Sequence, residues 1–172
     1  MSTLQVGNSF VLAGNVPAAR RRNAGTCRDV YEQNRQRIYA LAFWITDNEL
    51  AAEELMISTF CRAFAKSEAP TPEEIDCAFI AEARQCMPLG VLTLDCAPCD
   101  KSVCVRRNTL RVDLERAVVQ LPNTERMIFL MHDVENYGHA RIARILDFTE
   151  EESRRGLHQA RLRIRELLTR QP

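Results

Sequence analysis

The sequence predicts an all-α protein made of two small helical domains. Apolar residues recur at spacings of three and four in 28–45, 49–66 and 149–169, as on one face of a helix. Two stretches open on a Thr followed three residues later by Glu, the pattern of a helix capping box. The 172 residues include 6 Gly and are 6% aromatic, a composition that favours helices. The length suits two small domains or one of medium size.

Composition places few limits on function. The chain is 46% apolar and 27% charged with a formal net charge of zero, so global charge gives no argument for a nucleic-acid partner. No apolar run is long enough to cross a bilayer, and the basic cluster at 20–22 follows the apolar N-terminal part, the reverse of a secretory signal. The seven cysteines are an odd number, which favours reduced thiols. We therefore expect a cytoplasmic protein.

The first two predicted helices form an antiparallel hairpin. The first runs from about Arg28 to Ile45, with an inner face of Val30, Ile38, Leu41, Ala42 and Ile45. Thr46-Asp47-Asn48 ends it and caps a second helix over 49–66. The inner stripe of the second helix comprises Ala52, Leu55, Thr59 or Phe60, and Ala63. The short connection makes the two helices neighbours.

A third helix is predicted over 73–86, because Thr71-Pro72-Glu73-Glu74 is a capping box with Pro at the first helical position. Ile75, Phe79 and Ala83 share one face, and Pro88-Leu89-Gly90 stops the helix. The cysteines that follow raise a zinc hypothesis: Cys86, Cys96, Cys99 and Cys104. Only Cys96 and Cys99 form a close pair, so a thiol-rich linker is favoured over a structural metal site. We expect no cofactor and no metal.

The stretch 121–168 predicts three helices, the last two joined by a short turn as in a helix-turn-helix. Ile142, Ile145 and Leu146 would form the inner face of the first helix of this pair. Thr149 to Glu152 is a capping box that opens the second, whose buried stripe is Leu157, Ala160, Ile164 and Leu168. Its opposite side is basic, and carries Arg154, Arg155, His158, Gln159, Arg161, Arg163 and Arg165.

A helix-turn-helix places the start of its second helix in the DNA major groove. Arg154 and Arg155 are the best candidates for base edges, because Arg pairs bidentately with guanine. His158 and Gln159 lie one turn further along. Arg161, Arg163 and Arg165 would meet phosphates or form a solvated face. His139 and Arg141, at the start of the supporting helix, could touch the DNA backbone.

These motifs resemble region four of bacterial extracytoplasmic-function sigma factors. The resemblance rests on LP at 121–122, ERxxFLxxDVE at 125–135, IAxIL at 142–146 and LHxARxRxRELL at 157–168. The N-terminal half resembles region two of the same family. There the matching patterns are RIYALAxxxTDNxxxAEEL at 37–55 and FxRAF at 60–64.

The resemblance implies a two-domain sigma factor that binds core RNA polymerase and, through the helix-turn-helix, the minus-35 promoter element. Its implied parts are a tail at 1–26, a region-two-like domain at 27–90, a linker at 91–107 and a region-four-like domain at 108–172. It also implies an anti-sigma factor as a regulatory partner. The residues that it places against polymerase are Glu53, Glu54, Ile57, Ser58 and Arg62.

The chain departs from the family at identifiable positions. Ile57-Ser58 stands where the family has Gln-Glu, and the helix that would open the minus-10 element has Phe79 as its only aromatic and Arg84 as its only base. In the last helix, Ser153 replaces an apolar residue. Gly156 replaces a longer side chain, which removes one phosphate contact and costs about 1 kcal/mol relative to Ala.

Two alternative functions remain open. The chain could be a sigma-like protein that holds polymerase or an anti-sigma factor without opening promoters, or a plain helix-turn-helix regulator acting through 110–170. An enzyme is not indicated, because there is no glycine-rich phosphate loop, His-Glu metal motif or nucleophile elbow. Trp44 is either covered by the N-terminal tail or the following segment, or serves as an anchor for a partner protein.

Overall fold

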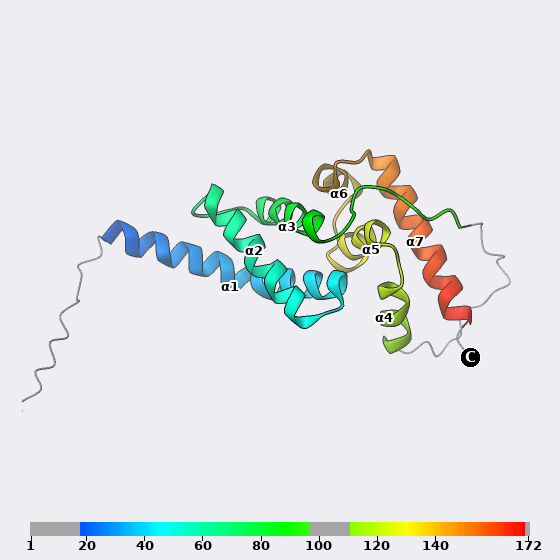
Figure 1. Cartoon of the computed structure of the whole chain (residues 1–172). Coiled ribbons are helices and arrows are strands. Elements are labelled where there is room, and N and C mark those ends of the chain that lie inside the picture. The colour runs from blue at the N-terminus through cyan, green and yellow to red at the C-terminus, as the bar shows by residue number, and fades with distance from the viewer. Residues whose placement is uncertain (1–17, 97–110, 171–172) are drawn as a thin grey trace, which may run out of the picture.

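The computed structural model describes the backbone over 18–96 and 111–170 and the side chains over 26–96 and 111–169. All the regular secondary structure of this described part is helical, with no strand, as predicted (Figure 1). Its α-helices, with one π-helical segment η1, are α1 (Ala18–Thr46), α2 (Glu49–Lys66), α3 (Pro72–Cys86), α4 (Arg111–Val119), α5 (Asn123–Phe129), η1 (Leu130–Val134), α6 (His139–Leu146) and α7 (Glu150–Arg170). None of the described helices is long and apolar enough to span a membrane.

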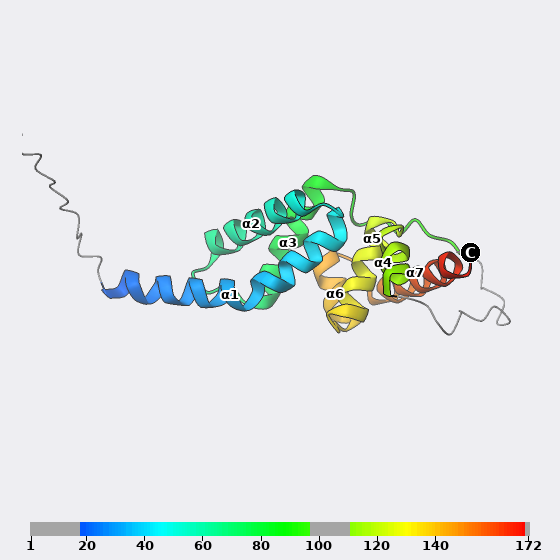
Figure 2. The same cartoon turned by 90° about the horizontal axis from the view of Figure 1, so that it is seen from below.

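The first unit of the fold is the α1–α2 hairpin with α3 packed against α2 (Figure 2). The predicted stripes of the hairpin are buried, except that Val30 is half-buried, and Thr59 and Phe60 are both buried. Asn48 caps α2 as predicted, and its side chain accepts a hydrogen bond from the Ala51 N–H at 3.0 Å. The sequence pattern therefore predicted this unit well.

Helix α1 begins at Ala18, earlier than the predicted start at Arg28. Residues 18–26, expected in a tail, are helical, and the rest of that predicted tail lies outside the described residues. The segment AARRRNA contains strong helix formers and no proline, and the helix continues through Gly25. The apolar stripe begins only at Val30, so periodicity gave no signal for these first turns.

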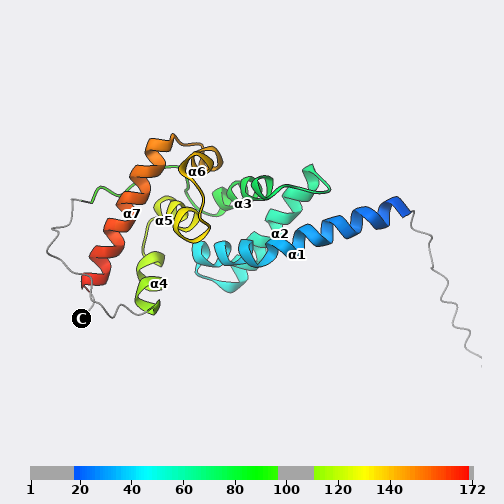
Figure 3. The ribbon, with the colours of Figure 1, turned by 180° about the vertical axis from the view of Figure 1, so that it is seen from behind.

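The second unit contains α4, α5, η1, α6 and α7 (Figure 3). Helix α4 was not predicted, whereas α5, α6 and α7 correspond to the three predicted helices. Asp147 takes a left-handed conformation with φ 61°, which turns the chain between α6 and α7. Thr149 and Glu152 form the predicted capping box, because Thr149 N–H donates to the Glu152 carboxylate at 2.8 Å and Glu152 N–H to Thr149 Oγ1 at 3.2 Å.

The segment 88–96 is an extended strap over the second unit. The Gly90 N–H donates to Thr124 Oγ1 at 3.2 Å, and the Thr93 and Leu94 N–H groups donate to Glu125 Oε1 at 2.5 and 2.7 Å. Glu125 is fully buried, so these hydrogen bonds satisfy one oxygen of an otherwise costly carboxylate. The described start of the predicted linker at 91–107 is thus attached to α5, and residues 97–107 lie outside the described part.

The two units pack directly against each other, mainly through α3 on α6 and α1 on α5. One connection is Arg126 of α5, whose buried guanidinium donates to the Trp44 and Ile45 carbonyls at the end of α1 at 3.3 and 3.0 Å. A cation at a helix C-terminus is favoured by the helix dipole. The same guanidinium also donates to the carbonyls of Val119 and Leu121. Arg126 therefore ties the end of α1 to the α4–α5 connection.

Candidate nucleic-acid and polymerase interfaces

The outward face of the first turns of α7 presents three of the predicted DNA-binding residues to solvent. Arg154, Arg155 and His158 are exposed. Arg154 Nη2 lies 2.7 Å from Glu150 Oε2, an exposed ion pair one turn apart. Such pairs are worth little in water, so Arg154 can exchange Glu150 for another acceptor at small cost. This turn of α7 offers guanidinium and imidazole groups at spacings suited to a groove.

Of the three acidic residues in the first turn of α7, the cap binds one, Glu152. The backbone N–H and hydroxyl of Thr149 donate to the Glu152 carboxylate and lower its pKa below the usual value. Because the fold lowers this pKa, ionised Glu152 stabilises the folded chain at neutral pH. That stabilisation is lost as the pH falls. Glu151 stays exposed, with its carboxylate 3.8 Å from Arg154.

The more distal basic residues of α7 differ in their surroundings. Arg161 is bidentate with Asp133 of η1, at 3.0 and 2.6 Å, and Arg163 pairs with Glu166 at 2.7 Å. Burial would raise the pKa of Asp133, but hydrogen bonds from Arg161 and His132 outweigh it and lower that pKa. Arg165 is exposed. The Arg161 side chain thus stabilises the contact of α7 with η1 as well as lying on the predicted DNA face.

His139, predicted to touch the DNA backbone, is half-buried between α6 and α7. Its Nδ1 lies 2.9 Å from Oγ of the buried Ser153, and its ring stacks on His132 with centroids 4.7 Å apart. Burial, together with the positive charges of His132 and Arg154, lowers the pKa of His139. Ser153 therefore serves as the polar partner of His139, which explains a hydroxyl at a core-facing position.

Gln159 and Gly156 of α7 face the strap and α5. The Gln159 side-chain carbonyl accepts a hydrogen bond from the Cys96 N–H at 2.6 Å. Gly156 is buried, and a Cβ built there would lie 2.6 Å from Ile128 Cδ1 and 2.8 Å from Leu92 Cδ2. The expectation that Gly156 removes a phosphate contact was wrong, because this position faces α5 and the strap and not the solvent.

The predicted polymerase-binding residues lie along α2. Glu53, Glu54, Ile57 and Ser58 are exposed, and the exposed fraction of Ile57 reaches 56%. Arg62 differs, because its Nε pairs with Glu82 of α3. Glu53 and Ile57 also line a shallow groove of about 320 Å³ between α1 and α2, together with Tyr31, Tyr39, Met56 and neighbouring polar residues. The face combines apolar area with carboxylates.

The helix expected to open the minus-10 element presents one of its two predicted groups to solvent, Arg84, and buries the other, Phe79. Phe79 of α3 is fully buried, and Arg84 Nη2 donates to the Leu146 carbonyl of α6 at 2.7 Å. Capture of a flipped or unstacked base needs an accessible aromatic face and free positive charge. In this conformation α3 offers no accessible aromatic face at Phe79, and Arg84 is exposed with one N–H group bound to α6.

Trp44 is half-buried beside a groove that is also lined by α4, an element that neither sequence interpretation included. Trp44 and Phe43 line a groove of about 490 Å³ with residues of α4, among them Val112 and Val119. No group of His, Cys, Asp and Glu able to hold a metal occurs among the described residues. Cys96 is described, whereas Cys99 and Cys104 of the zinc hypothesis lie outside the described part.

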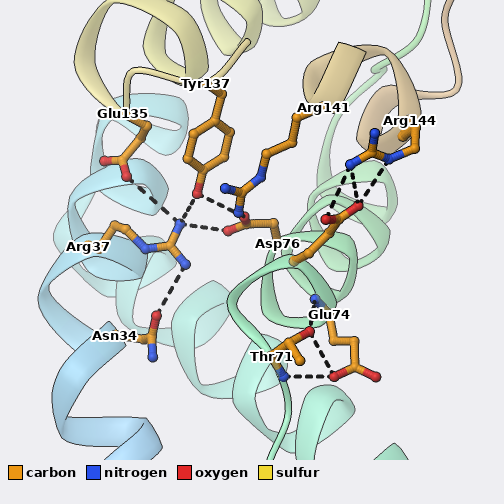
Figure 4. Close-up of polar contacts among 10 residues, drawn as sticks. Asn34, Arg37, Thr71, Glu74, Asp76, Glu135, Tyr137, Arg141 and Arg144 are labelled. Carbon is orange, nitrogen blue, oxygen red and sulfur yellow. Dashed lines mark hydrogen bonds and ion pairs between the residues drawn. The ribbon is translucent and has the colours of Figure 1, made fainter. Parts of the chain in front are cut away.

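Sequence reasoning missed a polar cluster between the two units (Figure 4). Asp76 of α3 is 1% exposed and accepts hydrogen bonds from Arg37 at 2.6 Å, Tyr137 at 2.8 Å and Arg141 at 2.7 Å. The sequence contained one indication of this cluster, because Asp76 lies between Ile75 and Phe79 in a helix with a predicted buried face. A buried carboxylate requires hydrogen-bond or charged partners.

The cluster also accounts for Arg141, which was predicted to contact the DNA backbone. Its guanidinium carbon lies 3.7 Å from the centroid of the Tyr137 ring, a cation–π arrangement. Burial and the neighbouring Asp76 raise the pKa of Tyr137 well above its usual value, so its hydroxyl remains a donor. In this conformation Arg141 binds α3.

Comparison with known proteins agrees with these features. A family model described as sigma-70, region 4, matches residues 111–164, the segment that contains α4 to most of α7. The chain is similar in structure to the sigma factor RpoE of Bartonella quintana, solved in complex with the anti-sigma factor NepR. That similarity has a TM-score of 0.53 at 15% identity and covers 91% of this chain and 100% of the other. No curated protein matches the sequence.

The resemblance predicted from the motifs is thereby confirmed at two levels. Residues 111–164 match the sigma-70 region 4 model, and this segment includes α6 and most of α7. The chain as a whole has the all-α fold of a sigma factor.

Proposed function

We propose that this chain is an extracytoplasmic-function sigma factor, which recruits core RNA polymerase to promoters without any enzymatic step or cofactor. The observation that carries the proposal is the region 4 match over 111–164, combined with the sigma-factor fold of the rest of the chain. Its parts are a region-two-like domain at 27–90, a linker at 91–107 and a region-four-like domain at 108–172, preceded by residues 1–26.

The minus-35 element is assigned to the exposed face of α7. Arg154 and Arg155 read base edges, and His158 extends the contact by one turn. The other predicted contacts, namely Gln159, Arg161, His139 and Arg141, act at phosphates once they exchange their internal partners. The exposure of Arg154, Arg155 and His158 supports their assignment to bases and the assignment of the other residues to phosphates.

Core polymerase is assigned to the outer face of α2, through Glu53, Glu54, Ile57, Ser58 and Arg62. An exposed Ile beside carboxylates suits a helical partner with apolar and basic residues. An anti-sigma factor is a further proposed partner, because the similar RpoE was solved with one.

A second candidate function is a sigma-like protein that holds polymerase or an anti-sigma factor without opening promoters. The specific observation in its favour is that Phe79 is fully buried and Arg84 is bonded to α6. Run-off transcription with core polymerase and promoter fragments separates the two candidates. A transcript supports the sigma factor, whereas a holoenzyme that binds promoters without yielding transcript supports the second candidate. No association with core polymerase would contradict the sigma factor and the polymerase-holding form of the second candidate, and would favour a plain helix-turn-helix regulator.

Arg154→Ala tests the assignment of α7. It should weaken binding to the matched minus-35 site by about 1–3 kcal/mol and relax base preference at one position. Binding of selected and scrambled duplexes, measured by fluorescence anisotropy, provides the comparison. Equal losses on both duplexes would show that Arg154 contacts a phosphate and not a base.

A further inference from the structure

The contact between α3 and α6 joins the two units through side chains of opposite charge. Arg141 and Arg144 of α6 point to α3, where Arg141 binds Asp76 at 2.7 Å and Arg144 binds Glu73 at 3.0 Å (Figure 4). Arg84 of α3 completes the contact by donating to the last carbonyl of α6, that of Leu146. We call these five side chains and that carbonyl the α3–α6 latch.

The latch occupies the helix that a helix-turn-helix lays across the DNA backbone. Arg141 and Arg144 are the arginines of α6, and both are bound to carboxylates of α3. A guanidinium recognises carboxylate and phosphate oxygens with the same planar fork of donors. Glu73 and Asp76 therefore supply the ligand chemistry that DNA phosphates would supply, and α3 covers this side of α6.

The burial of Asp76 does not prevent the latch from opening. Arg37 of α1 belongs to the same unit as Asp76 and binds it at 2.6 Å, so Asp76 keeps a guanidinium partner when α6 leaves. Burial would lower the pKa of Arg37, but Asp76 raises it above the usual value, so Arg37 stays charged. The first unit therefore retains its own ion pair in the open state.

Two features weaken the closed state, in which the latch holds α6 against α3. Arg141 Nε is buried without a hydrogen-bond partner among the described residues, and an unsatisfied buried N–H disfavours the state that contains it. The Arg144–Glu73 pair is largely exposed, with side-chain exposures of 61% and 44%, so water and salt weaken it. Both guanidiniums thus have reason to exchange their carboxylates for phosphates.

We propose that Glu73 and Asp76 act as internal phosphate mimics, which compete with DNA for Arg141 and Arg144 and hold the chain closed until α3 leaves α6. The proposal rests on the proposed DNA-binding function of α6 and α7 and adds a regulatory element to it. The ligand that competes is the DNA backbone, so the effect does not depend on base sequence.

The test measures binding of a random-sequence duplex of about 30 base pairs to the full-length chain, at several salt concentrations. The variants are Glu73→Gln, at a half-buried position in the first turn of α3 where the amide keeps the shape of the side chain, and Asp76→Asn. The matched control is Glu74→Gln, which removes the same charge from the same helix. Among the described residues Glu74 makes its side-chain hydrogen bonds to Thr71 of the capping box, and Gln can replace Glu there.

Glu73→Gln should tighten binding by up to about fivefold, the equivalent of an exposed ion pair, and Asp76→Asn by more. Each freed Arg that meets a phosphate should make the log–log salt dependence steeper by about 0.9. Asp76→Asn should also increase the radius of gyration in small-angle X-ray scattering at unchanged helicity. Glu74→Gln should alter none of these quantities.

Equal affinities and salt slopes for the parent and both latch variants would overturn the competition while leaving DNA binding intact. Equal tightening by Glu74→Gln would also overturn it, because the effect would then be one of net charge. Absence of binding by every protein at low salt would contradict the DNA role of α6 and α7 itself, and with it the competition.

Discussion

Helices α2 and α7 are both long, amphipathic and predicted to carry a binding face, yet the structure uses them differently. Helix α2 packs on α1 and α3 by its buried stripe, and four of its five predicted contact residues are exposed. Helix α7 packs on α4, α5 and α6 and also contacts the strap through Gln159. On α2, the position of a residue around the helix therefore predicts whether it is buried or exposed. On α7, several polar residues of the predicted outer face instead bind other residues of the chain.

The largest expected effect tests the single buried stripe of α2. Leu55→Asp places an unpaired charge at a side chain that is 3% exposed, which should cost at least about 4 kcal/mol and unfold the α1–α3 unit. Circular dichroism and thermal unfolding measure the loss. Leu50→Asp, on the same helix but 67% exposed, is the control and should leave the helicity unchanged. Two equally stable variants would mean that α2 does not bury this stripe.

The next effect concerns the connection between the two units. Arg126→Leu leaves the carbonyls of Trp44, Ile45, Val119 and Leu121 without their donor, and should destabilise the protein by about 3 kcal/mol. Urea unfolding followed by Trp44 fluorescence reports the change. Arg111→Leu removes an arginine whose side chain is 89% exposed and should change stability little. Similar free energies of unfolding for the two variants would show that Arg126 does not stabilise the contact between the two units.

The third prediction addresses the covered side of α7. Gly156→Lys should cost about 2 kcal/mol or more, because its side chain would displace Ile128 and the strap residue Leu92. Gly156→Ala should be close to neutral, since a helix gain of about 1 kcal/mol offsets small shifts of two flexible side-chain ends. Chemical denaturation of both variants gives the comparison. A stable Gly156→Lys protein would indicate that this position faces solvent.

The smallest effect is a pH dependence of stability that comes from the contact of His139 in α6 with Ser153 in α7. The pKa of His139 is lowered in the fold by burial, then by His132, Arg154 and Arg161 against the opposing effect of Glu150. As the pH falls below about 6.5, the unfolded chain therefore binds a proton before the folded chain does, and stability decreases. His139→Asn should flatten the stability profile between pH 7 and 5. The control His158→Asn, at an exposed position, should retain the parent slope.

Sequence patterns predicted the local structure of much of the described chain. Caps at Asn48, Thr71 and Thr149 and the apolar stripes of α1, α2, α3 and α7 depend on residues three or four apart, which a sequence displays directly. Helix α4 was missed because its nine residues, RVDLERAVV, present a weak stripe. The first turns of α1 were missed for the same reason.

The candidate sites were predicted unevenly. Exposure at Arg154, Arg155 and His158 follows from helical phase alone. The internal partners of His139, Arg141, Gln159 and Arg161 could not be predicted, because they lie on other elements: Ser153, Asp76, Cys96 and Asp133. A guanidinium or an amide bonds equally well to a phosphate, to water or to a distant carboxylate, so residue type does not decide between them.

The sequence by itself determined the all-α class, the helix-turn-helix and its sigma-factor motifs, since each is encoded in short-range spacing. Tertiary structure decided that the two units pack together, that Arg126 caps α1, and that Asp76 collects Arg37, Tyr137 and Arg141 at one point. The physical reason is that a buried charge must find its partners among residues far apart in the chain. Arg37 and Tyr137 are separated by 100 positions, a distance over which no periodicity carries information.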